Sequence, residues 1–423
     1  MAGFGRAVQA SIFGDGARGR MPVVPSSYAS LEAAAAGALS PEAFAYLAGA
    51  AGAETTTSEN RAALDRWRIV PRIMRDVGER DLSIELFGRR YPTPLLAAPI
   101  GALSLAHREA DLGIARAAAS LGIPYIASNQ ASIPLEAAFG ATPGAPHWFQ
   151  LYWSSSDALV ASLVGRAEAA GAEAIVVTLD THLLGWRPRD LDLGYLPFAH
   201  GLGIAQYTSD PVFQELVRAR VASRAAPERG RITIAAIRTL LDLSLAHPGS
   251  IGANLRSPIP RAAVDTFLEV FSRSTLTWPD LASLRSLTSL PILVKGIQHP
   301  DDARLALAHG ADGIIVSNHG GRQLDGAIGS ADALPAIVRE VAGRAPVLFD
   351  SGVRSGRDVL VALALGASAV LVGRPWVYGL AVDGARGAET VLRALVAELD
   401  ISMGVAGVRS VVGMPGGTVI RRP

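Results

Sequence analysis

Eight short apolar runs recur along this chain, and each of them ends in glycine or in polar residues. Continuous apolar runs, unlike runs that alternate with polar residues, are typical of strands buried on both faces, and such strands belong to parallel sheets. The eight runs are LLAAP (95–99), PYIAS (124–128), HWFQLY (147–152), AIVVTLD (174–180), PILVKG (291–296), GIIVSN (313–318), PVLFDSG (346–352) and AVLVGR (369–374).

Segments with apolar residues at helical spacing lie between these runs, and several end in glycine, as helices commonly do. Most neighbouring runs begin about 22 to 33 residues apart, the length of one strand with its following helix. Eight such units predict an α/β protein with a closed (β/α)8 TIM barrel. An open doubly wound sheet is the alternative, although such sheets usually have fewer strands. The predicted helices span residues 108–122, 157–171, 299–310, 331–343 and 355–366.

Two regions interrupt this alternation, yet a barrel with such additions can hold all 423 residues in one domain, 1–423. Residues 1–80 precede the first strand and are predicted to form a helical extension, with a helix cap at Ser40-Pro41-Glu42. Residues 188–280 form a long insertion after the fourth strand, with a helical run at 259–271. Because loops after barrel strands border the active site, the insertion is predicted to be a lid. An oligomer contact and a partly disordered loop are the alternatives.

Composition excludes several classes of protein and site. The chain has no cysteine, so disulfides, thiolate metal sites and a cysteine nucleophile are excluded. Its formal net charge of +1 gives no basic field for nucleic acid. The N-terminus lacks the apolar core of a signal peptide, and no segment has the length and apolar character of a membrane span. A cytoplasmic location is therefore expected. The histidines are scattered without paired spacing, and no metal site is predicted.

Polar side chains follow nearly every predicted strand. In a parallel barrel, catalytic groups come from the C-terminal strand ends, which meet at one face. A polar residue at one strand end is unremarkable, but a polar residue at nearly all of them predicts a site lined from every side. These residues are Ser128, Asn129, Gln150, Tyr152, Thr178, Asp180, Lys295, Ser317, His319, Asp350 and Arg374.

The sharpest local pattern is Ser-Asn-His-Gly-Gly-Arg-Gln at 317–323. It places His319, a base suited to neutral pH, just beyond a buried strand, next to two glycines that allow a tight turn. Arg322 follows, and its guanidinium suits a carboxylate. Asp180 could orient His319, and Arg187 could supply a second carboxylate contact. The alternatives are a structural histidine and an aspartate that caps the next helix.

The remaining strand ends predict a phosphate-binding site and include a lysine whose role the sequence does not decide. Lys295 would point into the barrel mouth, where it could form a Schiff base, bind phosphate or stabilise negative charge on a reduced cofactor. Glycine and arginine in Asp350–Gly356 and Gly373–Pro375 follow the last two strands, where barrels commonly bind phosphate. The chain has no P-loop and no strand-linked G-x-G-x-x-G, which weakens the case for a nucleoside triphosphate or a Rossmann-bound nicotinamide.

These residues, in this order, resemble the FMN-dependent 2-hydroxy acid oxidase/dehydrogenase family, from about residue 26 to 410. The segment 317–323 is similar to the active-site signature of the family. Leu-Val-Lys-Gly (293–296), Asp-Ser-Gly-Val-Arg (350–354) and Val-Gly-Arg-Pro (372–375) add to the resemblance. Within the family, Gly-Trp-Arg-Pro-Arg-Asp-Leu (185–191) most resembles lactate 2-monooxygenases.

The resemblance implies FMN as the cofactor and assigns roles by position. His319 would take the substrate proton with Asp180 as its partner. The substrate carboxylate and hydroxyl would be held by Arg187, Arg322, Tyr46 and Tyr152. The flavin ring and ribityl chain would be contacted by Pro99, Ile100, Gly101, Ser128, Gln150, Thr178, Lys295 and Ser317. The phosphate would be bound by Asp350, Ser351, Gly352, Val353, Arg354, Gly373 and Arg374.

The resemblance also implies partners and leaves the reaction's outcome open. The partners would be a small L-2-hydroxy acid and dioxygen, in a homo-oligomer such as a tetramer or octamer. An oxidase would release the 2-oxo acid and peroxide, whereas a monooxygenase would decarboxylate the oxo acid. A dehydrogenase that reduces a quinone or protein, and a phosphosugar aldolase or isomerase barrel, are the alternatives. Gln130 and His182 depart from the residues that relatives tend to carry, and the 214–260 stretch is longer than in lactate 2-monooxygenases. A larger or more polar hydroxy acid than lactate is therefore also considered.

Overall fold

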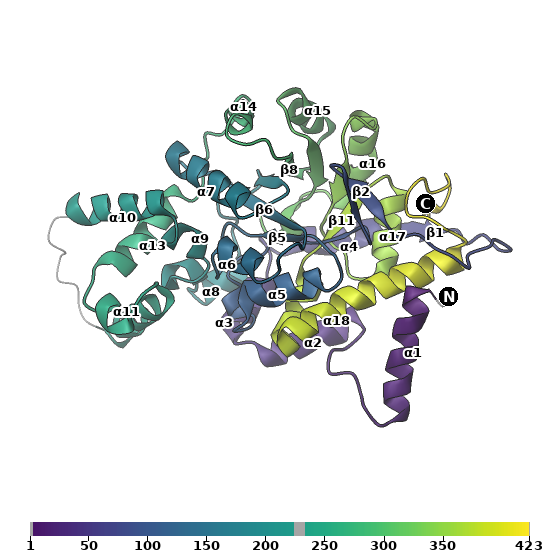
Figure 1. Cartoon of the computed structure of the whole chain (residues 1–423), viewed down its shortest axis with the longest axis horizontal. Helices are drawn as coiled ribbons and strands as arrows, with labels where there is room; N and C mark the ends of the chain where they lie inside the picture. The colour runs from purple at the N-terminus through teal and green to yellow at the C-terminus, as the bar shows by residue number, and fades with distance from the viewer. Residues whose placement is uncertain (1–2, 224–232, 423) are drawn as a thin grey trace.

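Eight parallel strands close into a barrel, as the eight apolar runs predict (Figure 1). The computed structural model describes residues 3–223 and 233–422 of the chain. Each strand pairs with its neighbours in chain order, and the last pairs with the first, so the open-sheet alternative is wrong. The strands are β4 (Leu95–Ala97), β5 (Tyr125–Ala127), β6 (His147–Tyr152), β7 (Ile175–Thr178), β8 (Ile292–Ile297), β9 (Gly313–Val316), β10 (Val347–Phe349) and β11 (Ala369–Val372).

The register brings polar side chains from neighbouring strands to one level of the barrel. Tyr152 at the end of β6 lies opposite Thr178 on β7, and Thr178 lies opposite Lys295 on β8. All barrel-strand residues except Gly296 are buried, which explains why the runs are apolar up to their last positions. The polar residues therefore collect where the strands end.

Helices surround the barrel and follow the strands as expected from their periodicity (Figure 1). All five predicted helices are present within three residues of their predicted bounds. The longest helix, α18, is not among the helices predicted above, and its helical geometry is broken at Asp383 and Gly384. The surrounding helices are α5 (Ala110–Ala119), α6 (Leu135–Gly140), α7 (Asp157–Ala169), α15 (Pro300–Ala308), α16 (Ser330–Val341), α17 (Gly356–Ala364) and α18 (Arg374–Ala406).

The segment before the barrel is largely helical. Ser40 caps the third helix, where its hydroxyl accepts a hydrogen bond from the Ala43 amide at 3.2 Å, so the predicted cap is confirmed. A hairpin of β2 (Ile84–Leu86) and β3 (Arg89–Tyr91) leads into the barrel, and β1 (Trp67–Ile69) pairs with β12 (Val419–Arg421) near the C-terminus. The helices are α1 (Phe4–Ala17), which projects from the body in Figure 1, α2 (Tyr28–Ala38), α3 (Pro41–Ala48) and α4 (Thr55–Asp65).

The insertion between β7 and β8 forms a group of helices at one side of the barrel (Figure 1). Its aromatic side chains pack on one another, with the Tyr207 and Phe267 rings 4.8 Å apart. The insertion also contains a run rich in arginine, 217–231, part of which lies outside the described residues. The helices are α8 (Pro188–Asp192), η2 (Pro197–His200), α9 (Ala205–Thr208), α10 (Pro211–Ser223), α11 (Ile234–Ala246), α12 (Ile251–Asn254), α13 (Ile259–Val270) and α14 (Asp280–Arg285).

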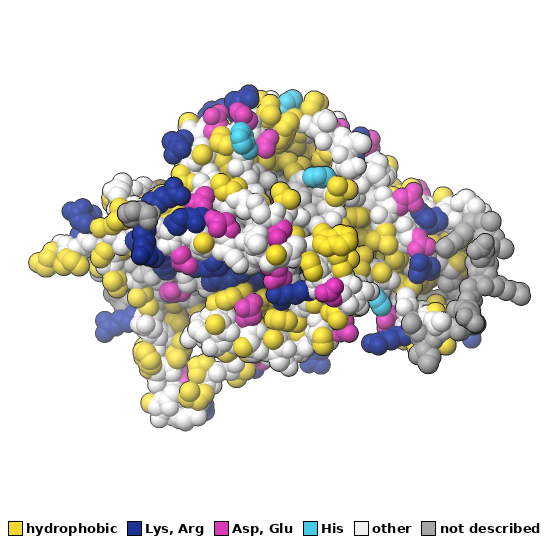
Figure 2. Space-filling view, turned by 180° about the vertical axis from the view of Figure 1, so that it is seen from behind, with side chains coloured by type: hydrophobic (Ala, Val, Ile, Leu, Met, Phe, Trp, Pro, Cys, Tyr) yellow, Lys and Arg dark blue, Asp and Glu magenta, His cyan; other side chains and the backbone are white. Residues whose placement is uncertain are grey.

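Charges of both signs are interspersed on the surface. Figure 2 shows lysine and arginine beside aspartate and glutamate over the face turned away in Figure 1, in keeping with a net charge of +1. Within the described residues, no helix combines the length and the apolar character that crossing a bilayer requires.

Candidate active site

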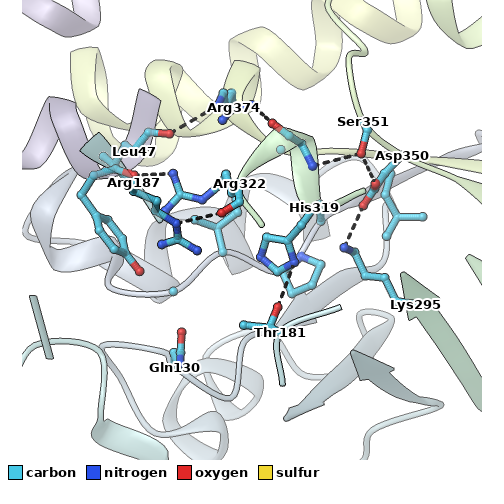
Figure 3. Close-up of a pocket in the computed structure, with 18 of the residues that line it drawn as sticks. Leu47, Gln130, Thr181, Arg187, Lys295, His319, Arg322, Asp350, Ser351 and Arg374 are labelled. Atoms are coloured by element: carbon cyan, nitrogen blue, oxygen red, sulfur yellow. Dashed lines mark hydrogen bonds and ion pairs between the residues drawn. The ribbon is translucent and has the colours of Figure 1, made fainter. Parts of the chain in front are cut away.

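One pocket lies at the C-terminal ends of the barrel strands and is lined from all sides (Figure 3). It gathers residues from the N-terminal extension, from the strand ends and from the insertion. The predicted site residues on its wall are Tyr46, Pro99, Ile100, Gly101, Tyr152, Arg187, Lys295, His319, Arg322, Asp350, Ser351, Gly352, Val353, Arg354, Gly373 and Arg374.

The loop after β9 holds His319 in an unusual backbone conformation. The φ angle of His319 is +58°, in the left-handed region that a non-glycine residue seldom adopts. Gly320 and Gly321 continue in this region, and a Cβ on Gly321 would lie 2.4 Å from the Thr57 hydroxyl. The hydroxyl of Ser351 holds the turn by accepting a hydrogen bond from the Gly320 amide at 3.0 Å. Such strain persists only where the surrounding structure imposes it, and it is common at functional sites.

The imidazole of His319 is paired with Asp180. Its Nδ1 lies 2.7 Å from Oδ1 of Asp180, while the hydroxyl of Thr181 donates to the same carboxylate oxygen at 2.9 Å. Asp180 does not cap a helix, since the next helix begins at Pro188. With Nδ1–H donated to the carboxylate, Nε2 is the basic nitrogen.

Electrostatics favour a neutral imidazole beside an ionised carboxylate. Burial lowers the pKa of His319 below its ordinary value, and the Asp180 carboxylate offsets part of that shift. Burial alone would raise the pKa of Asp180, but the charge of Lys295 and the hydrogen bonds from His319 and Thr181 hold it far below its usual range. At neutral pH the pair can therefore accept a proton at His319 and stabilise the resulting imidazolium.

Lys295 is a buried, charged ammonium group. Its Nζ donates to the hydroxyl of Ser317 at 2.8 Å and lies 3.3 Å from Oδ2 of Asp350. Burial alone would lower the pKa of Lys295, but the carboxylates of Asp350 and Asp180 raise it above its ordinary value. A Schiff-base lysine needs a neutral amine, so this environment instead suits a fixed positive charge.

Four arginines of the pocket have no carboxylate partner within the described residues. The guanidinium of Arg322 donates to the carbonyl of Gly49 at 2.8 Å, and that of Arg187 donates to the carbonyl of Arg322 at 3.0 Å. Arg374 donates to the carbonyl of Gly320 at 2.9 Å, and the guanidinium of Arg354 lies 4.1 Å from the centre of the Tyr28 ring. Carbonyl oxygens and a ring orient these cations without neutralising them.

This concentration of buried positive charge creates a site for anions. Burial and the neighbouring charge of Arg322 lower the pKa of Arg187 to about 10. Burial and the neighbouring charge of Arg354 likewise lower the pKa of Arg374 to about 10. Both groups stay charged at neutral pH, and an anionic ligand would relieve the repulsion between them, because opposite charge favours the ionised form. A phosphate and a carboxylate are the anions that such guanidinium groups suit.

Five predicted residues lie behind the pocket wall rather than on it. Asp180 reaches the pocket through His319, and Ser317 holds Lys295. The other three form a hydrogen-bonded row across the barrel strands: the hydroxyl of Ser128 donates to Gln150 at 3.1 Å, and the Gln150 amide donates to Thr178 at 3.1 Å. Asp350, expected among the phosphate contacts, directs its carboxylate toward Lys295.

The pocket also contains residues that the motifs did not identify. Thr181 follows Asp180 directly and could have been found from that position. Leu184, Phe198 and Phe271 belong to the segment after β7 and to the insertion, and their place on the wall depends on tertiary packing. Phe198 packs edge-on against Tyr46, with the ring centres 6.1 Å apart.

The donors of the pocket fit a flavin mononucleotide. The loops after β10 and β11 present backbone at Gly352, where φ is +87°, and at Gly373, together with Arg354 and Arg374 for a phosphate. Lys295 supplies a buried cation for an electron-rich ring. The pocket can therefore accommodate a phosphate and a carboxylate as two separate anions.

Comparison with known proteins agrees with this chemistry. The family described as FMN-dependent dehydrogenase matches residues 35–419. The chain belongs to the FMN-dependent dehydrogenase family. An L-lactate oxidase of Lysinibacillus sphaericus (strain C3-41) is 42% identical over 94% of this chain and 93% of that protein. The 4-hydroxymandelate oxidase of Amycolatopsis orientalis is 40% identical over 91% and 95%.

Solved structures of this FMN-dependent dehydrogenase family show the same architecture. The crystal structure of mandelate oxidase with (S)-4-hydroxymandelic acid matches with a TM-score of 0.75 at 38% identity, covering 94% of this chain and 98% of that chain. The predicted barrel, the resemblance to the family and the expectation of FMN are thereby confirmed. The protein is a flavin-dependent oxidoreductase, and the aldolase or isomerase alternative is wrong.

Proposed function

We propose that this family member oxidises a small L-2-hydroxy acid to its 2-oxo acid and passes the electrons to dioxygen. The observation that carries the proposal is the pairing of His319 with Asp180 in the same pocket as Arg187 and Arg322. A base and a carboxylate-binding pair are the two elements needed to hold a 2-hydroxy acid and remove its proton. The oxidase names of the relatives add support for dioxygen as the acceptor.

The substrate's two polar groups have matching donors. Arg187 and Arg322 would hold the carboxylate, since their guanidinium groups meet no carboxylate of the protein within the described residues. Tyr46 packs under Arg322, whose guanidinium carbon lies 5.0 Å from its ring centre, and would donate to the carboxylate or hydroxyl. Burial raises the pKa of Tyr152 to about 12, so its hydroxyl stays protonated and can donate a hydrogen bond.

His319 performs the proton transfer. Its Nε2 accepts the substrate proton, and the Asp180 carboxylate holds Nδ1–H and stabilises the positive imidazolium. Bound FMN supplies the two-electron acceptor for oxidation at the substrate Cα. It would be held by Lys295 and the backbone at Pro99–Gly101, with Ser128, Gln150, Thr178 and Ser317 around the ring and ribityl chain. Residues 350–354 with Gly373 and Arg374 would bind its phosphate.

The whole chain, 1–423, would act as one FMN-binding domain, in which the insertion at 188–280 covers the pocket. Phe198 and Phe271 support this role because both line the pocket from the insertion. We further propose a cytoplasmic homo-oligomer, a tetramer or octamer, without membrane or nucleic-acid partners. Release of peroxide is the proposed outcome, and decarboxylation within a closed pocket is the competing one.

An anaerobic screen of L-2-hydroxy acids tests the proposal. We expect the yellow holoenzyme to bleach when a substrate is added and to recover its absorbance within seconds in air. Equal amounts of 2-oxo acid and hydrogen peroxide support the oxidase, whereas carbon dioxide and an acid one carbon shorter identify a monooxygenase. Recovery only with a quinone or a redox dye would overturn dioxygen as the acceptor.

A further inference from the structure

The side-chain amide of Gln130 opens into the pocket and forms no hydrogen bond with the described residues of the protein. The residue is 7% exposed and lines the pocket, where Figure 3 shows its side chain on the side opposite Arg374. No hydrogen bond within the described residues involves its side-chain oxygen or nitrogen. A ligand that excludes water from this amide must replace the lost hydrogen bonds, and one that supplies a polar partner avoids the cost of leaving the amide unpaired.

The backbone around Gln130 is held on both sides. Its amide donates to the hydroxyl of Ser128 at 3.0 Å, and its carbonyl accepts a hydrogen bond from the Ala102 amide at 2.8 Å. A Cβ on Gly101 would lie 2.8 Å from Cβ of Gln130, so the two segments are in close contact. The backbone that carries the Gln130 side chain, in the loop after β5, is therefore held by neighbouring segments.

The insertion closes over the same residue. A Cβ on Gly203 would lie 3.0 Å from both the carbonyl of Gln130 and the Phe198 ring, which places this apolar ring beside Gln130. The amide of Ala205 also donates to the carbonyl of Ala131 at 3.1 Å. Phe271 and Leu184 contribute further apolar side chains to the wall. Gln130 thus presents a neutral polar group beside apolar side chains.

We propose that Gln130 is a specificity-determining residue that hydrogen-bonds a neutral polar group in the side chain of the hydroxy acid. The substrate class is then a 2-hydroxy acid with a hydroxyl or carboxamide on its side chain, a choice that rests on the proposed function. An apolar substrate leaves the amide dehydrated and unpaired, whereas a polar one satisfies it. A charged side-chain group would need a counter-charge at this point of the wall, which the neutral amide of Gln130 does not supply.

Two substrates of nearly equal shape test this assignment. L-2,4-Dihydroxybutyrate and L-2-hydroxypentanoate differ by a hydroxyl in place of a methyl group. We expect the holoenzyme to favour the dihydroxy acid at least about tenfold in kcat/KM. In Gln130→Met, which keeps the length but removes the amide, the ratio should fall to about one. Gln9→Met, the same change on the exposed surface of α1, should keep the wild-type ratio.

The outcomes separate this inference from the proposed function. If no 2-hydroxy acid bleaches the flavin, the proposed function fails. If both acids bleach it with equal kcat/KM in the wild type, or if Gln130→Met keeps the preference while retaining flavin absorbance, only the role of Gln130 is overturned. A preference for L-malate over both acids would likewise overturn it, because malate carries a charged group there.

Discussion

At the level of single residues, the base of this site combines strain with burial. The positive φ of His319 directs its ring toward Asp180 and the pocket, and the glycines that follow allow the chain to continue in the same region. Burial keeps the imidazole neutral, while the carboxylate prepares it to receive a proton. Neither effect would suffice alone, since a neutral imidazole without a counter-charge is a weaker base.

Replacing this base should separate cofactor binding from catalysis. In His319→Gln we expect FMN absorbance to remain, because the phosphate loops and Lys295 are unchanged. Anaerobic flavin reduction by the substrate should slow by at least about 100-fold, the usual contribution of a general base. Stopped-flow absorbance measures the rate, and reduction at the wild-type rate would rule out His319 as the base.

The pH dependence of flavin reduction should follow the protonation of His319 in its pair with Asp180. Because the pKa of His319 is lowered, kcat/KM for flavin reduction should stay level below the ordinary pKa of histidine and decline only at more acidic pH, as the base becomes protonated. In Asp180→Asn the carboxylate that raises this pKa is lost. The acidic limb should then move to lower pH, and the maximal rate should fall.

A control and a contradicting result sharpen this test. Asp192→Asn removes an exposed carboxylate from the insertion and should leave the profile unchanged. An acidic limb that stays at the same pH in Asp180→Asn would mean that a group other than His319 titrates.

At the level of elements, a buried carboxylate joins α5 to the segment that carries Gln130. Oδ1 of Asp111 accepts a hydrogen bond from the Tyr125 hydroxyl at 3.0 Å, and Oδ2 accepts one from the Ser132 amide at 2.8 Å. Burial raises the pKa of Asp111 to about 6. The folded state therefore binds this proton more tightly than the unfolded chain does, and stability should be lost as pH rises through about 4 to 6.

Asp111→Asn should remove this pH dependence. The free energy of unfolding of the wild type should carry a downward contribution, on the order of 2–3 kcal/mol, between pH 4 and 7 that the variant lacks. Urea unfolding of the FMN-saturated enzyme at several pH values measures the difference. The surface variant Asp192→Asn serves as the control, and a variant that parallels the wild type at every pH would contradict the assignment.

The elements that sequence predicts best are those that are buried on both faces. The barrel strands carry continuous apolar runs, and the helices between them show one apolar face, so both follow from local pattern. Helix α18 was missed, and two non-helical residues, Asp383 and Gly384, interrupt its periodicity. In the insertion, the predicted helical run at 259–271 corresponds to α13, whereas the other helices were not predicted from a local pattern.

The residues of the site also fall into those that the sequence predicts and those that it does not. His319 and Asp180 follow strands and Lys295 lies near the end of β8, so their meeting at one barrel face could be predicted from sequence. Phe198 enters the pocket through long-range packing, and the unpartnered amide of Gln130 is visible only when its surroundings are known. Residues at strand ends are predictable, whereas residues contributed by an insertion are not.

At the level of the whole molecule, the pocket joins three parts of the chain around an excess of positive charge. The extension contributes carbonyl oxygens such as that of Gly49, the barrel contributes the cations, and the insertion contributes apolar cover. Repulsion between desolvated guanidinium groups opposes folding unless an anion is bound. Cofactor binding should therefore contribute to the stability of the whole fold.

FMN should stabilise the protein through its phosphate as well as its ring. At a free concentration 100 times its Kd, a ligand that binds only the folded state adds about 2.7 kcal/mol to the free energy of unfolding. Arg354→Met removes one guanidinium that faces the phosphate loops but forms no ion pair within the described residues. We expect this variant to bind FMN at least tenfold more weakly, with a smaller rise in Tm at a fixed FMN concentration.

Riboflavin, which lacks the phosphate, distinguishes the two contributions. It should raise Tm equally in the wild type and in Arg354→Met, because only the ring contacts remain. Arg218→Met, an exposed substitution on α10, should respond to FMN as the wild type does. If Arg354→Met loses affinity for riboflavin as much as for FMN, the guanidinium supports the fold of the pocket rather than the phosphate, and the anion site must lie elsewhere among the remaining cations.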